Sequence, residues 1–341
     1  MRVLVTGDRG YIGSALVPRL LERGHDVVGV DAGFFESEGG GDDIRDVEAC
    51  RLDGVDAVIH LAALSNDPMG NLDPNLTEQI NYEASVRLAR LAKSGGVRRF
   101  LFSSSCSNYG AAGREIMTEE SPLNPVTAYG RSKVQTETAV RLLADDSFSP
   151  VFLRNATAYG VARSFRCDLV VNNLTAWAFT TGKVRVMSDG TAWRPLVHVD
   201  DIARAFVAAL EAPREVIHNQ LFNIGRTEEN YRVRDVAEII EREMPGVSIE
   251  YASRGGPDAR DYRVSFEKAE RTLVGYAPQW TVRDSIPQLL ELYAKAGLTA
   301  EDIEGPRFAR IARIRELLAE GALDAQLHWC PRRDSNTRPT A

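Results

Sequence analysis

A tyrosine and a lysine four positions apart could form an acid–base pair. Tyr129 and Lys133 occur in the segment AYGRSK, which the apolar pattern places at the start of a helix over residues 129–143. Residues four positions apart lie on one face of a helix. A phenol with a pKa near ~10 is a poor base at neutral pH, but a nearby ammonium favours the phenolate and lowers that pKa. We therefore predict that Tyr129 exchanges a proton with a substrate hydroxyl and that Lys133 tunes it.

Three consecutive serines, residues 103–105, end a predicted strand just before this pair. Parallel sheets place ligands at the carboxyl ends of their strands. Ser105 is the predicted third catalytic residue, with a hydroxyl that hydrogen-bonds the reacting oxygen and the tyrosine. The alternative is a serine-rich loop that caps its own backbone. Cys106 could be a further acid or base, although a small buried apolar residue is the more usual role.

Three glycines follow the first predicted strand and open the first helix, in the pattern TGDRGYIG. Gly7 suits a tight turn, Gly10 leaves room for a pyrophosphate, and Gly13 allows close packing of helix on strand. The free amides at the helix N-terminus, around Tyr11 and Ile12, would then face the phosphates. This context predicts a dinucleotide site rather than a simple turn.

An aspartate ends the second predicted strand, at the distance expected after the glycines. The Asp31 carboxylate could accept hydrogen bonds from the adenosine ribose, and it would repel a 2′-phosphate, so NAD is favoured over NADP. The alternative is a helix cap or a solvated loop carboxylate. Asp43 and Ile44 lie where a third strand should end and could flank the adenine.

The elements around these residues alternate between strand and helix. We predict strands at residues 3–5, 26–30, 57–61, 99–103 and 150–154, and helices at 11–23, 78–93 and 129–143. This order implies an α/β fold of the Rossmann type, with a doubly wound parallel sheet. The second half predicts strands at 195–199, 221–224 and 248–251, and helices at 200–210, 233–243, 282–296 and 308–320, which suggest a smaller mixed α/β substrate lobe.

Composition narrows the function. The 341 residues carry 48 acidic and 41 basic side chains, so the net charge is −7 and no basic cluster suggests nucleic acid. The four cysteines form no CxxC pair, so a metal site is not expected and a cytoplasmic location is favoured. No apolar run is long enough for a membrane span, and the opening MRVLVTG reads as a strand rather than a signal peptide.

These motifs, in this order, resemble the extended short-chain dehydrogenase/reductase family, which includes nucleotide-sugar epimerases, dehydratases and ketoreductases. The matching stretches run from TGDRGYIG through HLAA, SSSCSNYG, AYGRSK and LRNATAYG to RGGPDARDY. The resemblance implies that Ser105, Tyr129 and Lys133 are catalytic and that Lys133 also contacts NAD. It adds the turn formed by Leu61, Ala62 and Ala63 to the NAD site. It implies substrate-binding roles for Ser65, Asn173, Arg194, Arg254 and Arg260.

The resemblance also predicts domains and activity. Residues 1–165 and 194–224 are predicted to bind NAD, residues 166–193 and 225–320 to bind a nucleotide-diphosphate sugar, and residues 321–341 to form a disordered tail. The 4,6-dehydratases carry an Asp-Glu pair where this chain has Cys106 and Ser107, so dehydration is disfavoured. Thr157 and Pro195 are further departures from the family pattern.

The predicted function is a nucleotide-sugar epimerase, an isomerase that takes a hydride from a sugar carbon, C4 by preference, and returns it to the other face. The alternatives are a 4-ketoreductase of deoxysugar biosynthesis and a non-catalytic dinucleotide-sensing regulator. Family members are often dimers built on the helix that holds the tyrosine, so a homodimer is expected.

Overall fold

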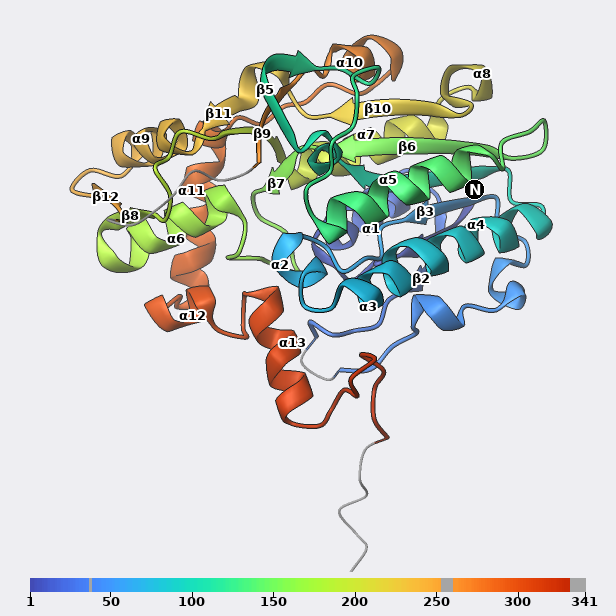
Figure 1. Cartoon of the computed structure of the whole chain (residues 1–341), viewed down its shortest axis with the longest axis horizontal. Coiled ribbons are helices and arrows are strands. Elements are labelled where there is room, and N and C mark those ends of the chain that lie inside the picture. The colour runs from blue at the N-terminus through green and yellow to red at the C-terminus, as the bar shows by residue number, and fades with distance from the viewer. Residues whose placement is uncertain (37–38, 253–259, 332–341) are drawn as a thin grey trace, which may run out of the picture.

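A six-stranded parallel sheet forms the centre of the computed structural model, which describes residues 1–36, 39–252 and 260–331 (Figure 1). The strand order is β10-β6-β4-β3-β1-β2. After β2 the chain crosses β1 to add β3 on its other side, so a crevice opens between β1 and β3 at their carboxyl ends. The six strands are β1 (Arg2–Thr6), β2 (Asp26–Val30), β3 (Ala57–His60), β4 (Arg99–Ser105), β6 (Ser149–Asn155) and β10 (Gln220–Ile224).

Helices cover both faces of this sheet, and its strands are accordingly apolar along most of their length. On one face, Leu16 and Leu20 of α1 (Tyr11–Glu22) pack with Ile202 and Phe206 of α7 (Val199–Glu211). The other face is covered by α4 and α5, seen in front of the sheet in Figure 1. The helices on that side are α2 (Asp67–Gly70), α3 (Pro74–Glu78), a π-helical turn (Gln79–Glu83), α4 (Ala84–Ser94) and α5 (Ala128–Arg141).

A smaller lobe has a core of its own, in which α6, α9 and α11 pack around short strands. This core includes Tyr159 and Leu196, which the predicted domain boundaries assign to the other domain. The remaining strands are β5 (Ala111–Met117), β7 (Thr157–Tyr159), β8 (Lys183–Val186), β9 (Trp193–His198), β11 (Asn230–Arg232), β12 (Ser248–Tyr251) and β13 (Asp261–Val264). They pair as β11-β9-β7, β12-β8 and β13-β5. The remaining α-helices are α6 (Val170–Thr181), α8 (Arg214–Ile217), α9 (Val233–Glu243), α10 (Glu267–Thr272), α11 (Val282–Ala296), α12 (Ala300–Glu304) and α13 (Arg310–Ala319).

Two features that the sequence predicted are wrong. No strand ends at Asp43; instead its carboxylate accepts a hydrogen bond from the amide of Arg45 and caps a 3₁₀ turn (Ile44–Asp46), because an aspartate can compete for backbone amides in this way. The predicted disordered tail begins too early, since residues 321–331 pack against the body of the protein with Leu323 and Leu327 buried. The last ten residues lie outside the described part of the chain.

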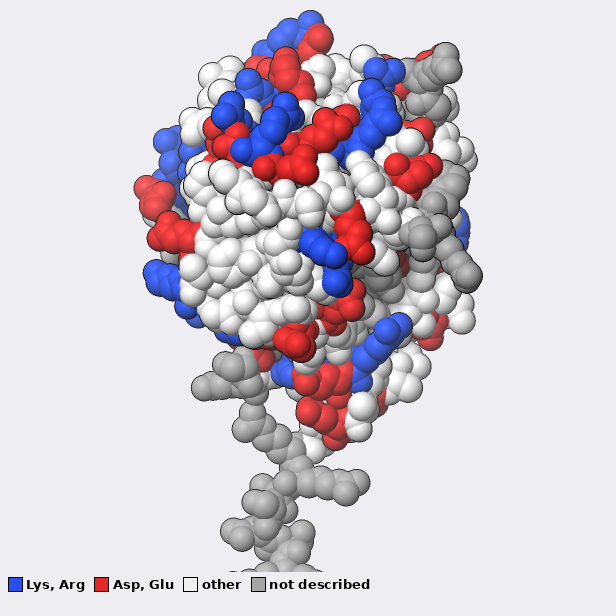
Figure 2. Space-filling view, turned by 90° about the vertical axis from the view of Figure 1, so that its left-hand side faces the viewer, with Lys and Arg blue, Asp and Glu red and all other residues white. Residues whose placement is uncertain are grey.

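The surface mixes the two signs of charge. On the face shown in Figure 2, lysine and arginine side chains alternate with aspartate and glutamate. Among the described residues, no helix is both long enough and apolar enough to span a membrane.

A buried ion pair ties α5 to β6 behind the serine-rich strand end. Arg154 Nη2 donates to Glu137 Oε2 at 2.6 Å, and both side chains are almost fully buried. Glu137 also accepts hydrogen bonds from Ser104 and Asn108. The guanidinium of Arg154 reaches the hydroxyl of Tyr109 as well. Because the atoms of both charged groups have partners, the pair fixes the position of α5 on the sheet.

Removing one member of this pair should destabilise the protein strongly. Arg154→Met leaves the Glu137 carboxylate buried without its cation, so the free energy of unfolding in urea should fall by about 3 kcal/mol. Adding Glu137→Gln to that variant should cost less than the sum of the two single changes. Arg141→Met, on the exposed end of the same helix, is the matched control. If the losses in the free energy of unfolding of the two single variants simply add up in the double variant, Arg154 and Glu137 are not coupled.

Candidate active site

A cavity of about 800 Å³ opens at the carboxyl ends of the central strands. Its wall is built by the loops after β1, β2, β3 and β4, by the start of α5, and by parts of the smaller lobe. This single cavity contains the predicted cofactor residues Gly7, Gly10, Tyr11, Ile12, Gly13, Asp31, Asp43, Ile44, Leu61, Ala62 and Ala63. It also contains the predicted catalytic hydroxyls of Ser105 and Tyr129.

The glycine loop needs two of its glycines for steric reasons. Gly7 has φ +72°, and a Cβ there would lie 2.9 Å from the backbone nitrogen of Ala62. A Cβ on Gly13 would lie only 2.1 Å from the carbonyl oxygen of Gly7. Gly10 precedes the first residue of α1 as its N-cap and has no side chain to occupy the helix end. The loop therefore brings bare backbone against the cavity at a helix N-terminus, as a phosphate requires.

Asp31 stands at the end of β2 on the cavity wall. Its Oδ1 accepts a hydrogen bond from the amide of Gly33 at 2.7 Å, and its Oδ2 accepts one from the amide of Arg9 at 3.2 Å. These bonds satisfy part of the carboxylate locally, as the loop-capping alternative requires, and they also hold it in one orientation facing the cavity. A carboxylate held in this way can accept further hydrogen bonds from hydroxyl groups.

The side chains of Tyr129 and Ser105 meet on the wall of the cavity. Tyr129 lies in the first turn of α5, whose N-cap Thr127 accepts a hydrogen bond from the amide of Gly130. Burial raises the pKa of Tyr129 to about 12, and a hydrogen bond with Ser105 lowers it in part. The net direction is opposite to the one predicted from the spacing of Tyr129 and Lys133, because removing the phenol from water outweighs its charged surroundings.

Lys133 lies behind the tyrosine, deep in the protein. Its ammonium donates a hydrogen bond to the carbonyl of Ser103 at 2.8 Å, lies 4.6 Å from the centre of the Phe102 ring and lies 5.7 Å from that of Tyr129. Burial lowers the pKa of Lys133 to about 7, and Glu137 raises it in part. The lysine therefore titrates near neutral pH and can gain or lose a proton beside the phenol.

His60, the residue before the Leu61–Ala63 turn, is a structural support. It is fully buried between Thr6 and Ser85, with hydrogen bonds of 2.6 and 2.7 Å to their hydroxyls. Burial, and then the charge of Lys133, lower the pKa of His60 to about 3. The imidazole is therefore neutral at physiological pH and fixes the turn next to the glycine loop.

Four of the five predicted substrate residues line the cavity: Ser65, Asn173, Arg194 and Arg260. Arg260 forms an ion pair with Asp67, and Arg194 donates to the carbonyl oxygens of Trp193 and Arg260. The fifth predicted residue, Arg254, lies outside the described residues.

The cavity wall also includes residues that the sequence did not single out. Arg166 is buried and pairs with Asp168 at 2.8 Å while reaching Ser65 at 3.3 Å. An arginine two positions before an aspartate is a weak signal of such a local pair. Tyr262 lies in the quoted DARDY stretch, and Arg310 lies in an amphipathic helix where an arginine normally faces water.

Residues 3–225 match the family described as the NAD dependent epimerase/dehydratase family. The UDP-glucose 4-epimerase of Corynebacterium glutamicum is 32% identical over 311 residues, which cover 82% of this chain and 92% of that protein. The chain belongs to the NAD-dependent epimerase/dehydratase family.

Solved structures of similar proteins agree with this assignment. MoeE5 in complex with UDP-glucuronic acid and NAD superposes with a TM-score of 0.76 at 27% identity, over 87% of this chain and all of MoeE5. The UDP-glucose 4-epimerase of Thermotoga maritima with UDP-glucose gives a TM-score of 0.74 at 25% identity, with the same coverage. The family fold therefore extends well beyond residues 3–225.

Cys106 occupies a position where the 4,6-dehydratases carry an acidic residue, and its surroundings show its role here. Cys106 points away from the cavity, where its thiol donates to the carbonyl of Arg154 at 3.2 Å. Burial raises the pKa of Cys106 well above its usual range. Cys106 is therefore a small packed side chain, whereas Ser107 lines the cavity.

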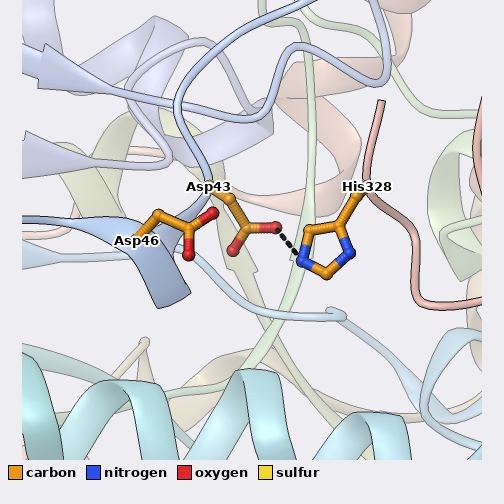
Figure 3. A group of neighbouring side chains, drawn as sticks. All are labelled: Asp43, Asp46 and His328. Atoms are coloured by element: carbon orange, nitrogen blue, oxygen red, sulfur yellow. Dashed lines mark ion pairs between the residues drawn. The ribbon is translucent and has the colours of Figure 1, made fainter. Parts of the chain in front are cut away.

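Three side chains beside the Asp31 loop could together hold a cation. Asp43, Asp46 and His328 bring one ligand atom each within 4.8 Å of one another, and His328 lies 4.0 Å from Asp43 (Figure 3). Asp43 already binds the guanidinium of Arg45 through both oxygens. The histidine therefore adds an ion pair between the C-terminal segment and this loop when it is protonated.

The buried lysine gives the protein a pH dependence of stability. The pKa of a free lysine is near ~10.4, and that of Lys133 is about 7, so between these values the unfolded chain holds a proton that the folded chain lacks. Stability relative to Lys133→Met should therefore rise from pH 7 to 9.5, by at most about 1.4 kcal/mol per pH unit. Urea unfolding checks this, with the exposed Lys295→Met as control. A difference that does not vary with pH would refute the buried titration.

Proposed function

We propose that this protein is an NAD-dependent epimerase that inverts one carbon, C4, of a nucleotide-linked sugar. The observation that carries the proposal is the meeting of the Ser105 and Tyr129 hydroxyls in one cavity with the glycine loop and Asp31. A cavity that held only the dinucleotide would have no need of this pair. The UDP-glucose 4-epimerases among the relatives support the choice of reaction.

The residues present fit NAD as the cofactor. The amides at the start of α1 suit its diphosphate, because the N-cap Gly10 has no side chain to cover the helix end. Asp31 suits the adenosine ribose hydroxyls, and its negative charge disfavours a 2′-phosphate. Bound NAD supplies the hydride acceptor and carries a positively charged nicotinamide ring, which favours ionisation of a nearby phenol.

The protein's own groups handle the proton. Tyr129 takes the proton of the C4 hydroxyl while the hydride leaves the same carbon, and the hydrogen bond with Ser105 holds the phenol in place. Lys133 lies close enough to stabilise the phenolate by its charge. When hydride and proton return, the hydride enters the opposite face of the sugar, so no net oxidation occurs.

This reaction requires that the nucleotide stays tightly bound while the sugar is free to turn over. We propose that Arg194 and Arg260 bind the substrate diphosphate, since guanidinium groups bind phosphate bidentately. Ser65 and Asn173 lie on the same wall and would contact the nucleotide and the sugar. In this division, residues 1–165 and 194–224 form most of the cofactor domain and residues 166–193 and 225–320 most of the substrate lobe, and Ser65 and Arg194 reach the substrate from the first of the two.

The alternative, a 4-ketoreductase, uses the same residues but consumes reduced cofactor in each turnover. The absorbance of NADH separates the two, because an epimerase leaves it unchanged during product formation. The NAD preference expected from Asp31 favours the recycling reaction. We also propose a homodimer through the exposed side of α5, which light scattering of the purified protein tests.

Replacing the phenol should stop the chemistry without releasing the cofactor. Tyr129→Phe should lower the turnover of UDP-glucose to UDP-galactose by at least about 100-fold, because the proton acceptor is lost. The amount of NAD bound per chain should stay unchanged, as measured by mass spectrometry. The exposed Tyr251→Phe serves as the control and should turn over normally. Near-normal turnover by Tyr129→Phe would overturn the assignment.

A further inference from the structure

The last helix brings an arginine into the cofactor cavity. Arg310 is the first residue of α13, is only 6% exposed, and lines the same cavity as the glycine loop and Asp31. Its guanidinium lies 3.7 Å from the centre of the Phe35 ring, and its Nη2 donates to the carbonyl and hydroxyl oxygens of Ser164 at 3.1 and 2.6 Å. The side chain is thus held in one place on the wall, although it lies outside residues 3–225 that match the family.

The charge of Arg310 has no direct counter-charge. Among the described residues, no carboxylate forms an ion pair with it, and its hydrogen-bond partners in Ser164 are neutral. Burial, and then the neighbouring Arg166, lower the pKa of Arg310 to about 9, although Asp168 and Asp31 oppose this. A buried cation among neutral partners is costly unless an anion joins it. The cavity is where such an anion can bind.

Arg310 belongs to a longer segment, residues 310–331, that packs along the loop following Asp31. We name this segment the C-terminal strap; Figure 1 shows it in red beside the blue residues of that loop. The indole nitrogen of Trp329 donates to the carbonyl of Ala32 at 2.6 Å, and its ring lies 6.0 Å from that of Phe34. Leu323 and Leu327 bury the strap in the same core as the sheet. The strap therefore holds both Arg310 and the loop in position.

We propose that Arg310 binds the diphosphate of NAD and that the C-terminal strap retains the cofactor between turnovers. The inference rests on the proposed function, because it requires NAD as the resident cofactor. A nucleotide sugar carries the same diphosphate chemistry. Phe35, on which the guanidinium packs, and Asp31, whose charge acts on Arg310, both belong to the cofactor wall, so NAD is the ligand that the position favours.

The test compares NAD binding with UDP binding in the full-length protein. Arg310→Gln should weaken the affinity for NAD by about 10- to 100-fold in calorimetry of the stripped protein, since a charge-assisted contact is lost. The affinity for UDP should stay unchanged. Arg310→Lys keeps the positive charge but not the forked geometry of the guanidinium, so it should lose less affinity for NAD than Arg310→Gln. Arg315→Gln, an exposed arginine on the same helix, is the matched control and should bind NAD normally.

Melting of the same variants with and without NAD gives a second readout. The rise in melting temperature on adding NAD should shrink in Arg310→Gln, because the stabilisation by a ligand grows with the logarithm of its concentration divided by the dissociation constant. Unchanged NAD affinity in Arg310→Gln, or an equal loss of UDP affinity, would overturn the inference. A wild-type chain that binds no NAD at all would instead overturn the proposed function.

Discussion

The order of three strands determines where chemistry can occur. Because β1 lies between β2 and β3, the loops that follow it and β3 separate and leave an open crevice. The glycine loop lines this crevice, and it can do so only because Gly13 has no Cβ to collide with the backbone of Gly7 and Asp8. Strand β4 lies next to β3 and delivers Ser105 to the rim, where α5 brings the tyrosine. The cavity at the carboxyl ends of the strands depends on this arrangement.

Burial, more than spacing, sets the acid–base properties of the site. The tyrosine and lysine both lose contact with water, so the phenol becomes a weaker acid and the ammonium a stronger one. These two pKa shifts leave a lysine that loses its proton near neutral pH and a phenol that keeps its proton. In the proposed mechanism, the positive charge of bound NAD adds to that of Lys133 in favouring the phenolate, which links the proton step to the presence of the cofactor.

The features that could be predicted from the sequence are those set by residues close together in the chain. Two of the predicted features are local patterns: the spacing of Tyr129 and Lys133 on one helix, and the order of strand, glycine loop and helix at the start of the chain. The helices predicted at 233–243 and 282–296 begin and end where the structure has them. The strand expected to end at Asp43 does not form, because the Asp43 carboxylate accepts a hydrogen bond from the amide of Arg45, which competes with strand pairing. Arg310 could not be found, since it meets the cavity through contacts to residues nearly 150 positions or more away.

The strap also has a consequence for biosynthesis. Synthesis proceeds from the N-terminus, and domains fold as they emerge. Strands β1 to β3 and the glycine loop are made early, yet Arg310 joins the wall beside Asp31, and Trp329 reaches Ala32, only after residues 310–331 have been made. The cofactor side of the cavity is therefore completed last, when the segment that begins with α13 docks against the loop after Asp31.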